Sequence, residues 1–218
     1  MLGVLALAPV QLYCASLEET LARMDQASQK FNSLSADMRK VSHTAVINVD
    51  TVDVGTVEMK RPKPHETRML LEVKPPDPKQ VLIDGKKVQI FFPNSLIVQE
   101  YNMSKYKSLL DQFLLLGFGS NSKELESAFT ISLGGPDVID GEKTTRLELV
   151  PKDQEMLVHL KRVDLWVSDE SGMPAQQKFY LPGNDYQIAT YSNIKLNPNL
   201  PDLKLDLPKN IKKEYPLK

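Results

Sequence analysis

The sequence predicts a mainly β fold with a few α-helices, in which about eleven antiparallel strands form one sheet and helices cover one of its faces. From Ser35 onward most segments alternate apolar and polar residues, which is the period of a strand with one buried face. Short turn sequences, such as Asp84-Gly85 and residues 182–185, join these segments as in antiparallel hairpins. Two long segments, near residues 16–31 and 104–117, have the period of a helix instead.

Length and composition favour a single domain. The chain has 218 residues, and all-β sandwiches and barrels of about 200 to 250 residues commonly form one domain. There are 27 Lys and Arg residues against 28 Asp and Glu residues, so the basic excess that nucleic-acid binding requires is missing. One Cys excludes an internal disulfide. We expect residues 16–218 to form one domain that acts as a monomer and has no nucleic-acid partner.

The first fifteen residues are typical of an export signal. Residues 1–10 are apolar and uncharged, and Cys14-Ala15-Ser16 has the small-x-small pattern of a cleavage site. No Lys or Arg precedes Leu12 to form the basic start of a signal peptide. We therefore interpret residues 1–15 as a partial signal segment; a strand or helix of the mature fold is the alternative. The apolar run is shorter than the about 20 residues that cross a bilayer.

Cys14 allows a second interpretation of this segment. A cysteine directly after an apolar run can be the lipid-modified residue of a lipoprotein. However, Gln11-Leu12-Tyr13 is a poor match to the small residues that precede such a cysteine. Removal of Cys14 with the signal is therefore favoured over a lipid anchor, and the rest of the chain is expected to be exported.

An amphipathic helix is predicted to begin at Ser16. Ser16 and Glu19 have the spacing of a capping box, in which each side chain satisfies a backbone N–H of the other residue. Leu17, Leu21 and Met24 then share one stripe of the helix. This stripe requires an apolar surface to cover.

The strand period continues to residue 194, with one helical interruption. Residues 104–117 are predicted to be a helix that ends at Gly117, and a shorter helix is predicted from a Ser122 cap to Ala128. The Pro-rich residues 196–218 are predicted to run extended along the surface. The predicted strands are residues 41–49, 67–73, 81–83, 88–92, 96–101, 129–133, 145–150, 160–167, 176–181 and 186–194.

No arrangement of residues indicates catalysis. His43, His65 and His159 lie on separate elements, and none has a partner at metal-ligand spacing. There is no Gly-x-Ser-x-Gly motif for a nucleophile, and no pair of carboxylates is singled out for acid–base chemistry. The sequence therefore predicts a protein that is not an enzyme and binds no metal or cofactor.

Large apolar side chains are concentrated in the helical interruption and on several strands. One interpretation is an ordinary core. The other is a half-open barrel whose helices form a lid over a cavity for acyl chains, and eight Met residues suit such an adaptable surface. In the second interpretation the candidate ligand-binding residues are Leu109, Leu110, Phe113, Leu114 and Leu116 of the lid and Met69, Ile90, Phe92 and Trp166 of the strands.

The order of several short motifs resembles the LolA family of periplasmic lipoprotein carriers. The resemblance extends over residues 16–210, and its motifs together are more specific than each one alone. The motifs are Lys60-Arg61-Pro62, Asp84-Gly85-Lys86, Phe91-Phe92-Pro93, the Leu-rich segment, Gly172-Met173-Pro174, residues 191–198 and Asp206-Leu207-Pro208.

This resemblance implies an open, twisted antiparallel half-barrel with helices covering its concave face. It also implies a periplasmic carrier that takes acylated lipoproteins, or another lipid, from an inner-membrane donor complex toward an outer-membrane acceptor protein. Arg61 matches the family's arginine that hydrogen-bonds to the helical lid and holds it closed. A guanidinium suits this role because it offers five donors.

Three positions depart from the family pattern. Glu58, Pro64-His65 and Gln89 stand where typical members have aromatic residues. These departures favour a different lipid, or a change of role. The alternative function is an envelope sensor with the same fold that binds a protein partner without transport.

Overall fold

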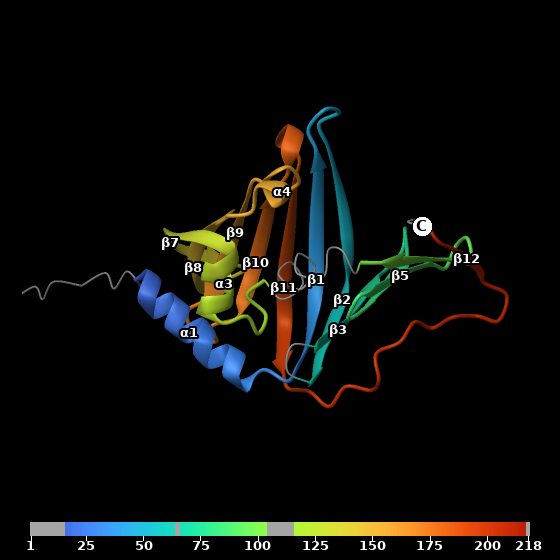
Figure 1. Ribbon diagram of the computed structural model, residues 1–218, viewed down its shortest axis with the longest axis horizontal. Helices are drawn as coiled ribbons and strands as arrows, with labels where there is room; N and C mark the ends of the chain where they lie inside the picture. Colours follow the sequence, from blue (N-terminus) through green and yellow to red (C-terminus); the bar gives the residue numbers. More distant parts are fainter. Residues whose placement is uncertain (1–15, 64–65, 104–115, 217–218) are drawn as a thin grey trace, which may run out of the picture.

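The computed structural model describes residues 16–63, 66–103 and 116–216 (Figure 1). Its main feature is one open sheet of twelve strands in the order β12-β6-β5-β4-β3-β2-β1-β11-β10-β9-β8-β7. Neighbouring strands are antiparallel, except that β12 is parallel to β6. The predicted fold class, a mainly β half-barrel with a few helices, is confirmed.

The sheet has two wings that meet at β1, the strand between β2 and β11. One wing is formed by β2 to β6 with β12, and we call it the β3–β6 wing after its central strands. The other is formed by β7 to β11, and we call it the β7–β11 wing. The strands are β1 (Ser33–Thr44), β2 (Val49–Lys63), β3 (Glu66–Val73), β4 (Lys79–Asp84), β5 (Lys87–Phe92), β6 (Ile97–Asn102), β7 (Phe129–Ile139), β8 (Glu142–Pro151), β9 (Arg162–Ser168), β10 (Pro174–Tyr180), β11 (Tyr186–Leu196) and β12 (Lys212–Glu214).

One predicted strand is wrong. Residues 41–49 were expected to be continuous, but β1 ends at Thr44 and β2 begins at Val49. The turn between them exposes Val46 by 90% and Ile47 by 66%, so apolar residues in a turn extended the alternating pattern of the strands. Asn48 has a φ of 50° and closes the turn, since Asn tolerates the left-handed region better than most residues.

The helices are α1 (Leu17–Lys30), α3 (Ser122–Ala128) and α4 (Gln154–Leu157), with a short 3₁₀ turn η2 (Pro182–Asn184). The predicted capping box of α1 is confirmed, because the Glu19 amide donates to Ser16 Oγ at 3.1 Å and the Ser16 amide donates to Glu19 Oε2 at 2.9 Å. The cap of α3 is Asn121 rather than Ser122. No described helix is both long and apolar enough to cross a bilayer.

Helices α1 and α3 lie on one face of the sheet, which we call the inner face (Figure 1). In β1 this face carries Leu34, Ala36 and Met38, and α1 contributes Ala27 and Phe31 to the same buried cluster. A second cluster joins α1 and α3 to the inner residues of β8 and β9, which include Leu147, Leu149 and Leu165. The helices therefore close the inner face of the β7–β11 wing.

The opposite, outer face of the β3–β6 wing is covered by the C-terminal segment, residues 197–211. Leu203 and Leu205 are only 2% and 8% exposed, and they pack on Leu70, Leu82, Phe91 and Val98. The segment was predicted to be extended along the surface. It is extended, but its leucines complete a third core.

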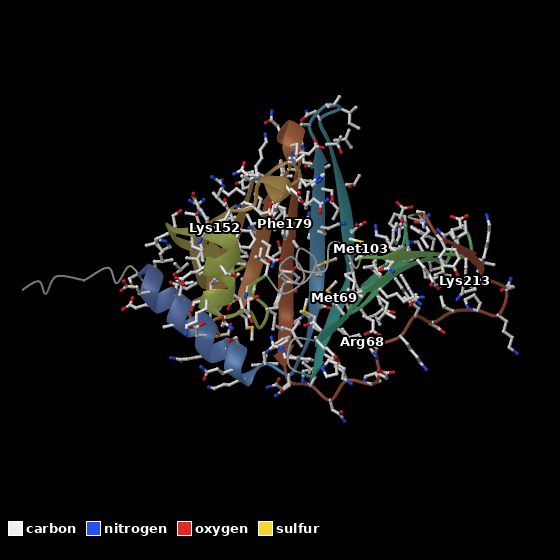
Figure 2. All side chains as sticks on the ribbon, viewed as in Figure 1. Arg68, Met69, Met103, Lys152, Phe179 and Lys213 are labelled. Carbon is white, nitrogen blue, oxygen red and sulfur yellow. The ribbon has the colours of Figure 1, made fainter. Side chains whose placement is uncertain are left out.

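Polar contacts hold the C-terminal segment, and the strand β12 that follows it, against the sheet. Arg68 Nη1 lies 2.6 Å from Asp202 Oδ1, and Lys213 Nζ lies 3.2 Å from Glu100 Oε1, with Arg68 and Lys213 labelled in Figure 2. The segment leads directly into β12, a short edge strand that the sequence did not predict.

Candidate ligand-binding site

The candidate site is the inner face of the β3–β6 wing. Cross-strand register brings Leu71, Val81 and Ile90 into one row on this face. The apolar side chains of this face that are neither fully buried nor fully exposed are Met69, Leu71, Val81, Val88, Ile90, Phe92, Ile97 and Tyr101. By contrast, Leu147, Leu149 and Leu165 under the helices are 0% exposed. Apolar surface is therefore accessible on one wing and closed on the other.

Three of the predicted binding residues share this site. Ile90 pairs with Val81, and Met69 pairs with Ile83. Phe92 follows Ile90 by two residues and so points to the same side. Because side chains alternate along a β-strand with a period of two, the sequence alone shows that Ile90 and Phe92 lie on the same side of β5. That Met69 of β3 lies on the same face as Ile90 and Phe92 follows only from the order and register of the strands.

The predicted lid residues are only partly within the described chain. Leu116 is 0% exposed and belongs to the helix-covered cluster with Leu165, so it is core at the end of the Leu-rich segment. Leu109, Leu110, Phe113 and Leu114 lie outside the described residues.

Trp166 does not belong to the site. Its neighbours Leu165 and Val167 occupy the helix-covered core, so Trp166 points to the outer face. There its indole Nε1 donates to Asp137 Oδ2 at 2.9 Å, and this hydrogen bond is the main cause that lowers the pKa of the Asp137 carboxyl. The large side chain of Trp166 suggests a cavity residue, but the alternation of side chains along β9 places it on the outer face, away from the ligand face.

Arg61 contacts the chain just after the Leu-rich segment. Its Nη2 donates to the Gly119 carbonyl at 2.7 Å, and its guanidinium lies 5.1 Å from the centre of the Phe31 ring. Gly119 has a φ of +72°, and a Cβ there would lie 2.6 Å from Arg61 Nη2 and from Phe31 Cδ1. The close approach therefore requires glycine. The role of Arg61 in closing a lid remains a prediction.

A second contact to the same segment was missed from the sequence. Gln177 Nε2 donates to the Leu116 carbonyl at 2.5 Å, and the Tyr191 hydroxyl donates to Gln177 Oε1 at 2.8 Å. Burial raises the pKa of the Tyr191 phenol, which keeps it a donor. The Phe118 ring packs edge-on against Tyr191 at 4.8 Å. The sequence feature that could have indicated this contact is the polar Gln177 between Ala175 and Phe179, in a row of inner-face side chains that is otherwise apolar.

Replacing Gln177 with Leu is expected to lower the free energy of unfolding by about 1 to 3 kcal/mol, because the Leu116 carbonyl then loses its buried donor. Urea unfolding measures this change, and hydrogen exchange should show faster exchange at residues 116–119. Gln176→Leu on the outer face is the matched control, since its partner Thr190 is only partly buried and can bond to water. Equal effects of both changes would contradict the anchoring role of Gln177.

Charged side chains stand at one end of the inner face. Lys40 Nζ and Lys79 Nζ lie 3.0 and 3.1 Å from the same oxygen, Asp53 Oδ2. Burial raises the pKa of the Asp53 carboxyl, but the two ammonium groups outweigh burial and hold it below its usual value. Two cations thus share one anion at neutral pH.

Metal-ligating side chains are not clustered in the parts of the chain that the structure describes. His43 Nδ1 lies 2.7 Å from Asp50 Oδ1, and its ring stacks on Tyr186 at 4.6 Å. His159 is exposed beyond α4, and His65 lies outside the described residues. The site is therefore an apolar surface with one polar end, without a visible catalytic arrangement among these residues.

An open β half-barrel with helices on its concave face, and apolar surface left accessible on one wing, defines the structural class. The profile of the family described as "Outer membrane lipoprotein carrier protein LolA" matches residues 29–204. The chain belongs to the LolA family. Among functionally curated proteins, no sequence matches it.

Solved structures show the same fold at low sequence identity. An uncharacterized conserved protein from Thermus thermophilus is 13% identical with a TM-score of 0.55, over 91% of this chain and 98% of that one. Mycobacterium tuberculosis lipoprotein LppX is 14% identical with a TM-score of 0.50, over 84% and 98%. MucB is 14% identical with a TM-score of 0.53, and the match covers 85% of this chain but only 60% of MucB.

Proposed function

We propose that this protein is a carrier that binds the acyl chains of lipoproteins, or of another lipid, on the inner face of the β3–β6 wing. The observation that carries the proposal is the partly exposed row of apolar side chains on that face. Membership of the LolA family supports it. Burial of an acyl chain contributes about 25 cal/mol per Å² of apolar surface, so binding requires no chemical step and the protein acts without catalysis.

The two wings have their cores on opposite faces of the sheet, and this difference suits a ligand carrier. The β7–β11 wing is filled by α1 and α3, which gives it a closed core. The β3–β6 wing has its core on the outer face, under the C-terminal segment. The apolar side chains of its inner face that stay partly exposed can therefore contact a ligand without loss of this outer core.

The location and partners are part of the same proposal. Residues 1–15 direct export, and the carrier works in the periplasm as a monomer. It receives its acylated cargo from an inner-membrane donor complex and delivers it to an outer-membrane acceptor protein. Release at the acceptor requires a conformation that binds the acyl chain less tightly.

Native mass spectrometry with lipid extraction tests the proposal on protein purified from a bacterial envelope. The expected result is a bound acylated species, whose mass distinguishes a lipoprotein from a free lipid. A ligand-free mass that stays unchanged after incubation with acylated peptide and phospholipid would show that the apolar face is not a binding surface.

A second candidate function is an envelope sensor that binds a protein partner. The observation that favours it is the apolar turn of the β1–β2 hairpin, which projects at one end of the sheet (Figure 1) and exposes Val46 by 90% and Ile47 by 66%. MucB has a similar fold and has been solved in complex with MucA. A stoichiometric protein complex that contains no lipid, and that is lost in Val46→Asp/Ile47→Asp, would support the sensor.

A further inference from the structure

The apolar rows of the inner face end in charged residues at the same end of the sheet. In β1 the row of Leu34, Ala36 and Met38 continues to Lys40. Lys40 pairs with Asp53 of β2, and Lys79 begins the β4 row that continues to Val81. The three charged side chains meet at Asp53 Oδ2 although they come from separate strands.

These three side chains are partly shielded from solvent. The exposed fractions of the Lys40, Asp53 and Lys79 side chains are 25%, 18% and 27%. An ammonium group has three donors, and in the described parts of the chain Asp53 is the one side chain paired with each lysine. Each ammonium therefore retains capacity to donate to a further anionic oxygen.

The cluster carries a net positive charge at one end of the inner face. Two ammonium groups against one carboxylate leave a charge of +1. At the β6–β12 edge Lys212 and Glu214 form a neutral pair at 2.9 Å. Arg61, a further inner-face cation, donates to the Gly119 carbonyl. An anion that enters the inner face is thus attracted to the Lys40–Asp53–Lys79 end.

We propose that Lys40 and Lys79 form a subsite for the anionic headgroup of an acyl lipid whose chain lies along the inner face. The subsite rests on the proposed carrier function and specifies its ligand class, a lipid with a phosphate or carboxylate group. Charge-assisted hydrogen bonds from the two ammonium groups hold the headgroup oxygens. Asp53 competes with the headgroup for both lysines and keeps them in place when no ligand is bound.

The dimensions of the face suit such a ligand. The β4 strand begins at Lys79, and its six residues, Lys79–Asp84, extend over about 17 Å at about 3.3 Å per residue. One leaflet of a bilayer core of about 30 Å holds an acyl chain in about 15 Å. A chain that starts at the lysines can therefore be accommodated along the face together with its headgroup.

Native mass spectrometry with two lysophospholipids of the same acyl chain tests the subsite on the full chain. Lysophosphatidylglycerol has a net charge of −1, whereas in lysophosphatidylcholine the choline cation balances the phosphate and the net charge is zero. The wild-type protein is expected to bind the anionic lipid about tenfold more tightly, the effect of one charge-assisted hydrogen bond. In Lys40→Met/Lys79→Met this preference should be lost, so that the two lipids bind with the same affinity. Lys74→Met/Lys195→Met, at two exposed positions, is the charge-matched control.

Asp53→Asn gives a change of opposite sign and does not depend on the stability of the lysine variant. Removal of the competing carboxylate should strengthen lysophosphatidylglycerol binding about tenfold. Equal binding of both lipids by the wild type, or weaker anionic binding in Asp53→Asn, would overturn the subsite and leave the carrier function intact. If neither lipid binds, the carrier function itself fails. Inorganic phosphate alone, which lacks the acyl chain, should not compete at equal concentration.

Discussion

Ile90→Glu is expected to abolish acyl-chain binding while the sheet stays folded. Ile90 lies in the centre of the β3–β6 inner face, between Val81 of β4 and Gln99 of β6. Its side chain is partly exposed, so the unliganded protein can hydrate a carboxylate there. A bound acyl chain would remove that hydration at a cost of several kcal/mol, which corresponds to a loss of affinity of at least about 100-fold.

Titration with a fluorescent fatty-acid probe measures the affinity, and circular dichroism verifies the fold. Val52→Glu is the matched control, because Val52 is a β-branched residue that is 47% exposed and is adjacent in β2 to the inner-face residue Asp53. Alternation places Val52 on the outer face, so its variant should bind like the wild type. Unchanged binding in Ile90→Glu would exclude the β3–β6 inner face as the acyl-chain site.

Leu203→Ala is expected to lower the free energy of unfolding by about 3 kcal/mol. Leu203 is 2% exposed and packs with Leu70 and Phe91 in the outer-face cluster. Truncation of a buried leucine loses its transfer free energy and leaves a cavity. The effect comes from a segment that has no regular secondary structure, and it is large because none of the described helices packs on this face in its place.

Urea unfolding monitored by circular dichroism gives this free energy. Leu196→Ala is the control, since Leu196 is 42% exposed and its truncation should cost less than about 1 kcal/mol. Similar values for the two variants would mean that the C-terminal segment lies on the sheet without stabilising it. Neither residue lies on the inner face of the β3–β6 wing, so acyl-chain binding by the folded protein should not differ.

Features that depend on local sequence pattern were predictable without the structure. Alternation of apolar residues predicted most strands, and the Ser16–Glu19 pair predicted the start of α1, because capping involves residues three apart. The same alternation put Ile90 and Phe92 on one side of β5. Motif order singled out Arg61, which donates to the Gly119 carbonyl in the structure, and its role in closing a lid stays a prediction.

Local pattern failed where an apolar residue does not face the main core. Val46 and Ile47 continued the strand period through a turn that exposes them. The size of Trp166 favours the ligand face, but its neighbours Leu165 and Val167 occupy the helix-covered core, so Trp166 is buried on the outer face. In both cases the alternating pattern shows which residues share a side, and it does not show which side is covered.

Contacts between residues far apart in the chain became visible only in the folded sheet. Gln177 reaches the Leu116 carbonyl across 61 positions, and Lys40, Asp53 and Lys79 converge from three strands. The C-terminal leucines became core because the outer face of β3–β6 needed a cover. Such contacts depend on strand order and register, which are set by the packing of the whole sheet, so the charged end of the ligand face could not be derived from spacing along the chain.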